Sequence, residues 1–158
     1  MSPLTGAKSY AGIWAQKTKK LWPRRGINEK ETDGLHAMIG TPYLEGDYIY
    51  GGDSYGQLRC LKTSNGERVW EDTSVVPQAR WATVHMVRQG KCTWLFNELG
   101  ELVIAELSPT GYREIHRAKL IEPTGQQDQR EGGVCWAHPA FAGRHVMHEA
   151  RVNCSVPA

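Results

Sequence analysis

The chain has no long hydrophobic run, little net charge and no closely spaced cysteines. No stretch approaches the ~18 apolar residues of a transmembrane helix, so we expect no membrane span. The first twenty residues also lack the apolar centre of a secretory signal. A formal net charge of +2 over 158 residues gives no strong field for nucleic acid or an anionic membrane. The 4 cysteines show no Cys-x-x-Cys spacing, which disfavours a zinc ribbon or a disulfide scaffold.

Helical periodicity is also missing. No long segment repeats apolar residues every 3.6 positions, so we expect little helix. The residues present are typical of a globular protein, with 40% hydrophobic and 23% charged side chains. A chain of this size buries roughly 68–70% of its unfolded surface. We therefore expect a single domain with a hydrophobic core.

Glycine turns recur along the chain, each followed by a short strand-like run. Gly46, Gly90 and Gly143 each precede alternating apolar, aromatic or β-branched residues, the pattern of a half-buried strand. These glycines lie 44 and 53 residues apart. Later glycines keep nearly the same spacing, in the pairs Gly56 with Gly100 and Gly66 with Gly111. The spacing indicates an internal repeat.

Within each repeat, tight turns join short strands. Asn65-Gly66 predicts a type I′ hairpin turn. Residues 53–56 and 97–100 predict four-residue turns that end on glycine. The run 102–105 is apolar on both faces, so we expect that strand to be covered on both sides. A unit of about 44 residues with four antiparallel strands has the size of one β-propeller blade.

The sequence therefore predicts an all-β chain that forms a partial β-propeller of about three four-stranded antiparallel blades. We expect repeats to start near residues 41, 82 and 137. Residues 1–35 would hold the end of a preceding blade, with Leu21-Trp22 as its closing strand, and a loop. Residues 36–158 would hold about two and a half blades of a single domain. Because a closed propeller usually has 4–8 blades, we expect the chain to be part of a larger propeller, or to cover its open edges by association.

One segment carries a family resemblance. The sequence CLKTSNGERVW at 60–70 resembles the pyrroloquinoline-quinone-like (quinoprotein-type) propeller repeat, whose pattern is A-L-D-x-x-T-G-K-x-x-W. The matching positions are Leu61, Gly66 and Trp70. The next copy keeps Ala105, Thr110 and Gly111. The resemblance covers about residues 36–147 and is that of a C-terminal fragment.

Three residues of the repeat receive structural roles. Gly66 and Gly111 supply turn conformations that residues with a Cβ resist. Trp70, at the end of the outer strand, is expected to pack against the neighbouring sheet and to bury on the order of 150–250 Å².

The candidate ligand site is a set of positions between the blades. In propellers of this kind, ligands bind where loops from several blades converge at one end of the channel. The residues at equivalent inter-blade positions here are His36, Arg80, Trp81, Trp136 and His138. Together they would bind a planar or anionic ligand through stacking and charge-assisted hydrogen bonds. The alternative is that the tryptophan rings only pack between blades.

We assign no catalytic residue and no metal ligand. The run 52–56 fits the G-x-S-x-G nucleophile elbow, but a strand follows it where the elbow needs a helix. The histidines lack the spacing of a metal site. The carboxylates are scattered singly, so Glu98, Glu101 and Glu106 are expected to be solvated. A basic cluster at 17–25 is followed by acidic residues, so we expect no nucleic-acid partner.

The resemblance implies a non-catalytic binding or scaffold module without a cofactor. Its partner would be another protein or the remaining blades of a longer propeller. The alternative is a fragment of a quinone-dependent alcohol or sugar dehydrogenase, which would hold pyrroloquinoline quinone and Ca²⁺. Relatives of this type are often periplasmic or act in the cell envelope, whereas the residues leave the compartment open. The identity of the ligand, the oligomeric state and the pairing of a last strand at 152–156 also stay open.

Overall fold

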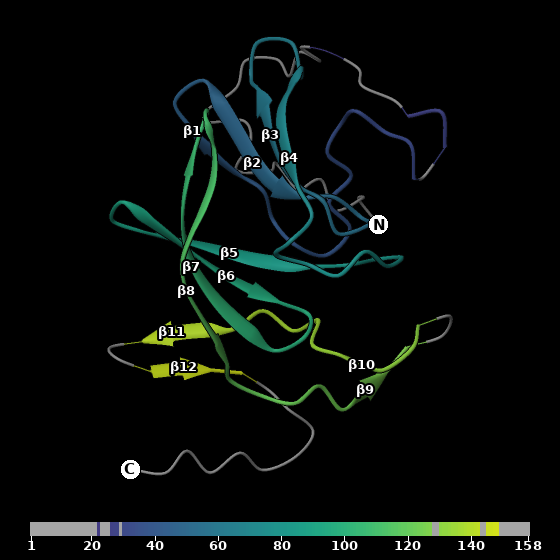
Figure 1. The fold of residues 1–158 in the computed structure, drawn as a ribbon, viewed down its shortest axis with the longest axis vertical. Helices are drawn as coiled ribbons and strands as arrows, with labels where there is room; N and C mark the ends of the chain where they lie inside the picture. The colour runs from purple at the N-terminus through teal and green to yellow at the C-terminus, as the bar shows by residue number, and fades with distance from the viewer. Residues whose placement is uncertain (1–21, 23–25, 29, 128–129, 143–144, 149–158) are drawn as a thin grey trace, which may run out of the picture.

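The computed structural model describes residues 22, 26–28, 30–127, 130–142 and 145–148 (Figure 1). It contains two four-stranded antiparallel sheets in which the strands follow one another in chain order. The first consists of β1 (Tyr43–Glu45), β2 (Tyr48–Gly52), β3 (Leu58–Lys62) and β4 (Arg68–Asp72). The second consists of β5 (Val84–Gln89), β6 (Cys92–Asn97), β7 (Glu101–Ser108) and β8 (Gly111–Lys119). The described residues form no helix, which confirms the all-β prediction.

Two smaller strand pairs follow. β9 (Gly125–Gln126) pairs with β10 (Gly133–Val134), and β11 (Ala140–Ala142) pairs with β12 (His145–Met147), both antiparallel. The sequence did not predict the β9–β10 pair. In Figure 1 the first sheet lies at the top, the second across the middle and the β11–β12 pair below it. A third sheet of four strands is not seen among the described residues, and the strand expected at 152–156 lies outside them.

The turns between strands follow the predicted glycines. Gly46 and Gly90 have φ of 58° and 60° in the turns that lead into β2 and β6. The four-residue turns are also confirmed, because the amide of Gly56 donates to the Asp53 carbonyl (3.1 Å). The Gly100 amide donates in the same way to the Asn97 carbonyl (3.0 Å).

The prediction for the β3–β4 turn was wrong in type. Gly66 has φ of 69°, but Asn65 is not among the described residues with positive φ, and a type I′ turn needs both. The chain instead forms a longer loop in which the Gly66 amide donates to the Lys62 carbonyl (2.8 Å). The Asn65 side chain accepts from the Glu67 amide (2.9 Å) and so closes the loop without entering the left-handed region itself.

The hydrophobic core lies between the two large sheets. Strand alternation turns one face of each sheet toward the other. The first sheet contributes Tyr50, Leu58 and Cys60, and the second contributes Val84, Leu95, Val103, Ala105 and Leu107. None of the described residues forms a helix long and apolar enough to cross a membrane.

The second sheet also has neighbours on its other face. Trp94 meets Phe141 of β11 with ring centres 5.2 Å apart, edge to face. Leu102 and Ile104 of β7, partly buried, pair with Phe96 and Trp94 on this face, whereas the alternating residues of β7 point into the core. The strand expected to be covered on both sides is therefore fully covered on one side and partly on the other.

Two tryptophan indoles each donate a hydrogen bond to a backbone carbonyl further along the chain. The Trp70 indole Nε1 donates to the Ser108 carbonyl at the end of β7 (2.7 Å), so the outer strand of the first sheet is bonded to the second sheet. The Trp22 indole donates to the Thr63 carbonyl of the first sheet (2.7 Å). A Cβ on Gly66 would lie 2.5 Å from the Trp22 ring, so glycine is what lets that ring dock.

Candidate functional site

Loops from successive sheets meet at one end of the molecule. Because the strands are antiparallel, the β2–β3 turn, the β6–β7 turn and the segments leading into β1, β5 and β11 all lie at this end, which we call the loop end. Backbone hydrogen bonds join them in a repeated way. The Ala82 amide donates to the Ser54 carbonyl (3.0 Å), and the Cys135 amide donates to the Glu98 carbonyl (2.7 Å). Ser54 and Glu98 are 44 residues apart, the repeat length.

Three of the five predicted rim residues form a contact chain there. The Arg80 guanidinium lies over the Trp81 ring, 4.7 Å from its centre. The Trp81 ring meets the Trp136 ring edge to face, with centres 6.4 Å apart. We call Arg80, Trp81 and Trp136 the rim cluster. The three residues are partly exposed.

Trp81 is held in an unusual backbone conformation. Its φ of 60° makes it the only non-glycine residue of the described part of the chain with a positive φ. A bulky residue in this region is strained, at a cost of order 1–3 kcal/mol. Such strain persists only where surrounding contacts outweigh it. The amide of the next residue, Ala82, bonds to Ser54 and holds the chain in that path.

A buried ion pair supports the rim cluster from beneath. The Glu98 side chain is 0% exposed and the Arg130 side chain 6%, and the Arg130 Nη2 bonds to Glu98 Oε1. The Arg130 Nη1 donates to Glu98 Oε2 (3.2 Å) and to the Arg80 carbonyl (2.7 Å). The Trp136 indole and the Thr83 amide donate to the same Oε2, at 3.4 and 3.2 Å. One carboxylate thus joins three loops.

The sequence analysis missed this pair. It expected Glu98 to be solvated, and that expectation was wrong, because the carboxylate is fully buried and accepts from four groups. One sequence signal for Glu98 was available. It lies in a turn 44 residues after Ser54, the repeat length, and such a turn faces the loops that converge at this end. Arg130 gave no signal, since it is 32 residues away in an irregular segment.

His36 lies at the corresponding position of the first sheet. Its amide donates to Asp53 Oδ1 (2.6 Å), and its Nδ1 lies 3.1 Å from Thr32 Oγ1. None of the contacts of the described residues joins His36 to the rim cluster.

His138 is connected to the rim cluster through another histidine. Its ring lies 4.7 Å from the ring of His85, whose Nε2 lies 2.9 Å from the Trp136 carbonyl oxygen. His138 is therefore next to the cluster, and His85 is a residue that the sequence analysis did not single out.

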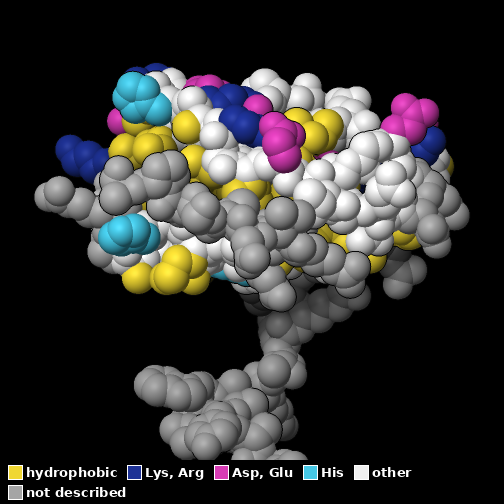
Figure 2. Space-filling view, turned by 90° about the horizontal axis from the view of Figure 1, so that it is seen from below, with side chains coloured by type: hydrophobic (Ala, Val, Ile, Leu, Met, Phe, Trp, Pro, Cys, Tyr) yellow, Lys and Arg dark blue, Asp and Glu magenta, His cyan; other side chains and the backbone are white. Residues whose placement is uncertain are grey.

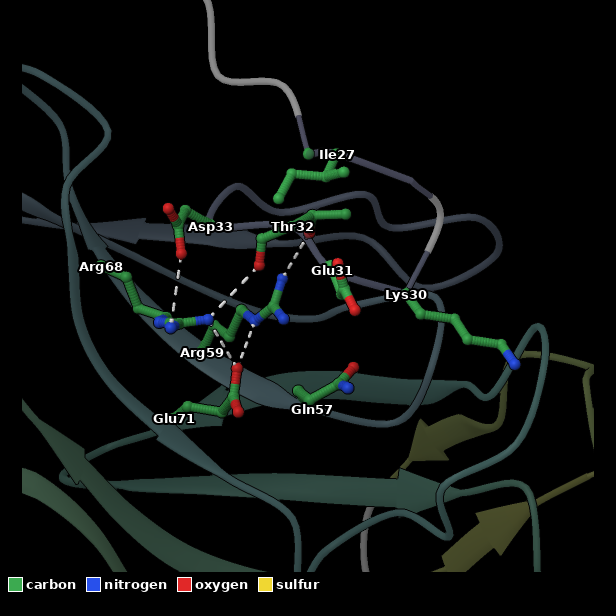
Figure 3. A pocket seen from close by; sticks show the side chains of 10 residues that line it. Ile27, Lys30, Glu31, Thr32, Asp33, Gln57, Arg59, Arg68 and Glu71 are labelled. Atoms are coloured by element: carbon green, nitrogen blue, oxygen red, sulfur yellow. Dashed lines mark hydrogen bonds and ion pairs between the residues drawn. The ribbon is translucent and has the colours of Figure 1, made fainter.

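A separate polar cavity lies beside the first sheet (Figure 3). Its volume is about 300 Å³, and its walls come from residues 26–33, the start of β3 and strand β4. The lining carries charges of both signs, from Lys30, Glu31, Asp33, Arg59, Arg68 and Glu71. Figure 3 shows that the arginines are tied to acids and to Thr32.

Arg59 is the centre of that network and is itself 2% exposed. Its Nε donates to Glu71 Oε2 (2.8 Å), and its Nη1 lies 3.2 Å from Asp53 Oδ1. The same nitrogen donates to the Gly34 carbonyl (2.7 Å). Because a buried cation needs this many partners, the network serves to fix residues 32–36 against the first sheet. We assign it a positioning role.

The described residues offer little that would activate a nucleophile. Burial raises the pKa of the Cys60 and Cys135 thiols, so both stay protonated at neutral pH. Ser54 lies between two strands, which the nucleophile-elbow geometry does not allow. Within the described ranges, no group of three or more His, Cys, Asp or Glu side chains is arranged to hold a metal ion.

No family model matches the chain, and no curated protein matches it. The resemblance to the quinoprotein-type repeat therefore depends on the residues and spacing of the motif.

Proposed function

We propose that this chain is a non-catalytic binding module, built as part of a β-propeller of the quinoprotein-like type. The repeated indole bonds support the propeller interpretation. Trp22 and Trp70 lie 48 residues apart and bond to carbonyls, those of Thr63 and Ser108, that lie 45 residues apart. A single docking geometry used twice is expected when equal sheets succeed one another around an axis.

The rim cluster is the proposed binding surface. The observation that carries this proposal is the strained backbone of Trp81, whose ring lies between a cation and a second indole. Strain of this kind accumulates at ligand sites, because a binding residue is held where function needs it. The Glu98–Arg130 pair, whose carboxylate is fully buried, fixes Trp136 and the backbone of Arg80, so the surface is preorganised.

The chemistry of the cluster selects the class of ligand. Arg80 offers charge-assisted donors, and the two indoles offer flat apolar faces. A protein partner would present these groups on a loop. An aromatic side chain of the partner would stack on Trp81, and an acidic side chain would pair with Arg80.

Replacing Trp81 with glycine tests the site without disturbing the fold. Glycine accepts φ of 60° freely, so Trp81→Gly relieves the strain while it removes the ring. We expect Trp81→Gly to unfold at a free energy within about 1–2 kcal/mol of the wild type, and to be more stable than Trp81→Ala by about 1 kcal/mol. Urea unfolding measures both differences, and Trp81→Ala being the more stable variant would contradict the strained geometry.

Binding is measured by capture on the immobilised protein, followed by mass spectrometry of the captured partners. We expect Trp81→Gly and Arg80→Ala to lose a partner that the wild type retains. The matched control is Arg113→Ala, since Arg113 is an exposed arginine on β8, paired with Glu106. Identical captured sets for all four proteins would refute the rim as a binding surface.

The alternative function, a fragment of a quinone-dependent dehydrogenase, has less support. Such an enzyme needs carboxylate and amide oxygens turned toward the quinone and its Ca²⁺. The two buried acids of the loop end, Asp53 and Glu98, instead face Arg59 and Arg130. Titration with pyrroloquinoline quinone and Ca²⁺ tests this alternative. A change in quinone absorbance that saturates would favour the dehydrogenase fragment over a non-catalytic module.

A further inference from the structure

Three histidines lie at the joint between the second sheet and the β11–β12 pair. His85 of β5 is 4% exposed, and its ring lies 4.7 Å from that of His138. The ring of His148, just after β12, lies 5.0 Å from Phe96, the cross-strand partner of His85. We call these three the histidine cluster. Seen from below, the side on which β11–β12 lies in Figure 1, histidine and hydrophobic side chains lie beside one another on the surface (Figure 2).

Hydrogen bonds determine which ring nitrogens carry protons. His85 Nε2 lies 2.9 Å from the Trp136 carbonyl, and His148 Nε2 lies 3.0 Å from the Ala137 carbonyl. A carbonyl only accepts, so each Nε2 carries a hydrogen, and in the neutral ring each Nδ1 is bare. Both of these Nδ1 atoms are buried and have no hydrogen-bond partner within the described residues.

Adding a proton to this cluster therefore places a charge where nothing receives it. Burial lowers the pKa of His85 most strongly, and the nearby His138 and His148 lower it further, while the bond to Trp136 opposes them. On β6 the group facing His85 is the uncharged Phe96.

Among the described residues, the other ionisable groups near the joint do not offset that charge. Glu98 and Arg130 are bonded to the indole and loop of Trp136 and neutralise each other. His145 of β12 is exposed and lines a cavity further along the joint.

That cavity leaves part of the apolar surface of the joint unpacked. Its volume is about 210 Å³, between Val87 and Trp94 of the second sheet and Phe141 and Ala142 of β11. A joint with an unfilled space loses part of the dispersion energy of a packed interface. The histidines therefore lie beside a part of the joint where apolar packing is incomplete. A charge on them opposes a smaller packing energy than it would in a filled interface.

We propose that the histidine cluster is a pH-responsive joint, and that its protonation loosens β11–β12 from the second sheet and releases Trp136 from the rim cluster. The first effect depends only on the joint, while the second is a regulation of the proposed binding site and rests on that function. The neutral His85 ring stabilises the joint above the pKa of free histidine, about 6.5. That stability is lost as the pH falls below 6.5 toward the lowered pKa of His85.

Hydrogen exchange of the full chain, followed by mass spectrometry, tests the joint. Exchange is compared at about pH 7.5 and about pH 5.5, after correction for the intrinsic exchange rate, a range that spans histidine titration. We expect peptides within 134–148 to lose about tenfold or more in protection at the lower pH. Peptides of β1–β4 serve as the internal control and are expected to keep their protection.

Variants assign the effect to the cluster. His85→Gln keeps a donor for the Trp136 carbonyl but cannot be protonated, and His148→Gln does the same for Ala137. Both are expected to retain protection at the lower pH, whereas the control His116→Gln, on exposed β8, behaves as the wild type. The proposal is overturned if wild-type protection at 134–148 does not fall, if it falls equally in β1–β4, or if His148→Gln and His85→Gln both respond as the wild type does.

A second readout separates this proposal from the proposed function. Any partner captured through the rim should be released at about pH 5.5 by the wild type and retained by His85→Gln. Exchange that changes as expected without any captured partner would support the joint and count against the binding function. A captured partner that the wild type holds equally at both pH values would refute the regulation and leave the binding function in place.

Discussion

At the scale of single residues, burial separates the acids of this chain into two kinds. Glu98 is fully buried and bonded to Arg130, whereas Glu106 is partly exposed and paired with Arg113. Both are single acids within the second repeat, one in a turn and one in a strand, and the sequence does not show which of them has a buried partner. The difference arises because Arg130 arrives from a distant segment and supplies the charge that a buried carboxylate requires.

Neutralising Glu98 is therefore expected to be costly. Glu98→Gln leaves Arg130 as an uncompensated buried cation, and we expect a loss of about 3–5 kcal/mol in the free energy of unfolding. Glu106→Gln removes an exposed partner and should cost at most about 1 kcal/mol. Urea unfolding of both variants measures the difference. Equal losses would show that Glu98 is not in the buried pair described here.

At the scale of elements, strands and turns follow from local chemistry, while the bonds between sheets do not. Glycines at 56 and 100 end their turns as predicted, because their φ of 91° and 77° suits glycine. The type of the β3–β4 turn was not predicted correctly, because the Asn65 side chain accepts from the Glu67 amide within the same loop. The motif pointed to Trp70, but only the packed sheets place its indole on the Ser108 carbonyl.

Removing the Trp70 indole nitrogen tests that bond. Trp70→Phe keeps an aromatic ring in the core and deletes the donor to Ser108. We expect a loss of about 0.5–1.5 kcal/mol from the hydrogen bond and more from the smaller ring, seen as a Tm lower by at least about 2–4 °C. The control is Trp94→Phe, since Trp94 contacts Phe141 through its ring and no indole hydrogen bond is seen for it among the described residues. A larger loss for Trp94→Phe would contradict this account.

At the scale of the whole molecule, the second sheet lies between two neighbours. Its one face packs into the core with the first sheet, and its other face carries His85, Trp94 and Phe96 toward β11–β12 (Figure 1). A sheet with two apolar faces needs a cover on each, because an exposed apolar face binds other surfaces.

Ending the chain after Ala137 removes that second cover. The shortened protein is expected to bind the apolar dye ANS with a rise in fluorescence of roughly twofold or more over the full chain. A full-length Phe141→Ala variant, which keeps both strands but loses the contact with Trp94, should give an intermediate signal. No increase for the shortened protein would mean that β11–β12 does not shield the face.

The all-β class, the positions of the turn glycines and the apolar strand at 102–105 follow from the sequence alone. These depend on alternation and on backbone freedom, which neighbouring residues decide. Only the tertiary structure decided that Arg80, Trp81 and Trp136 meet while His36 lies elsewhere, and that Glu98 and His85 are buried. Those outcomes depend on which distant segment supplies a charge, a carbonyl or a ring. The partners are 32 to 51 residues apart in the sequence, and only folding brings them together.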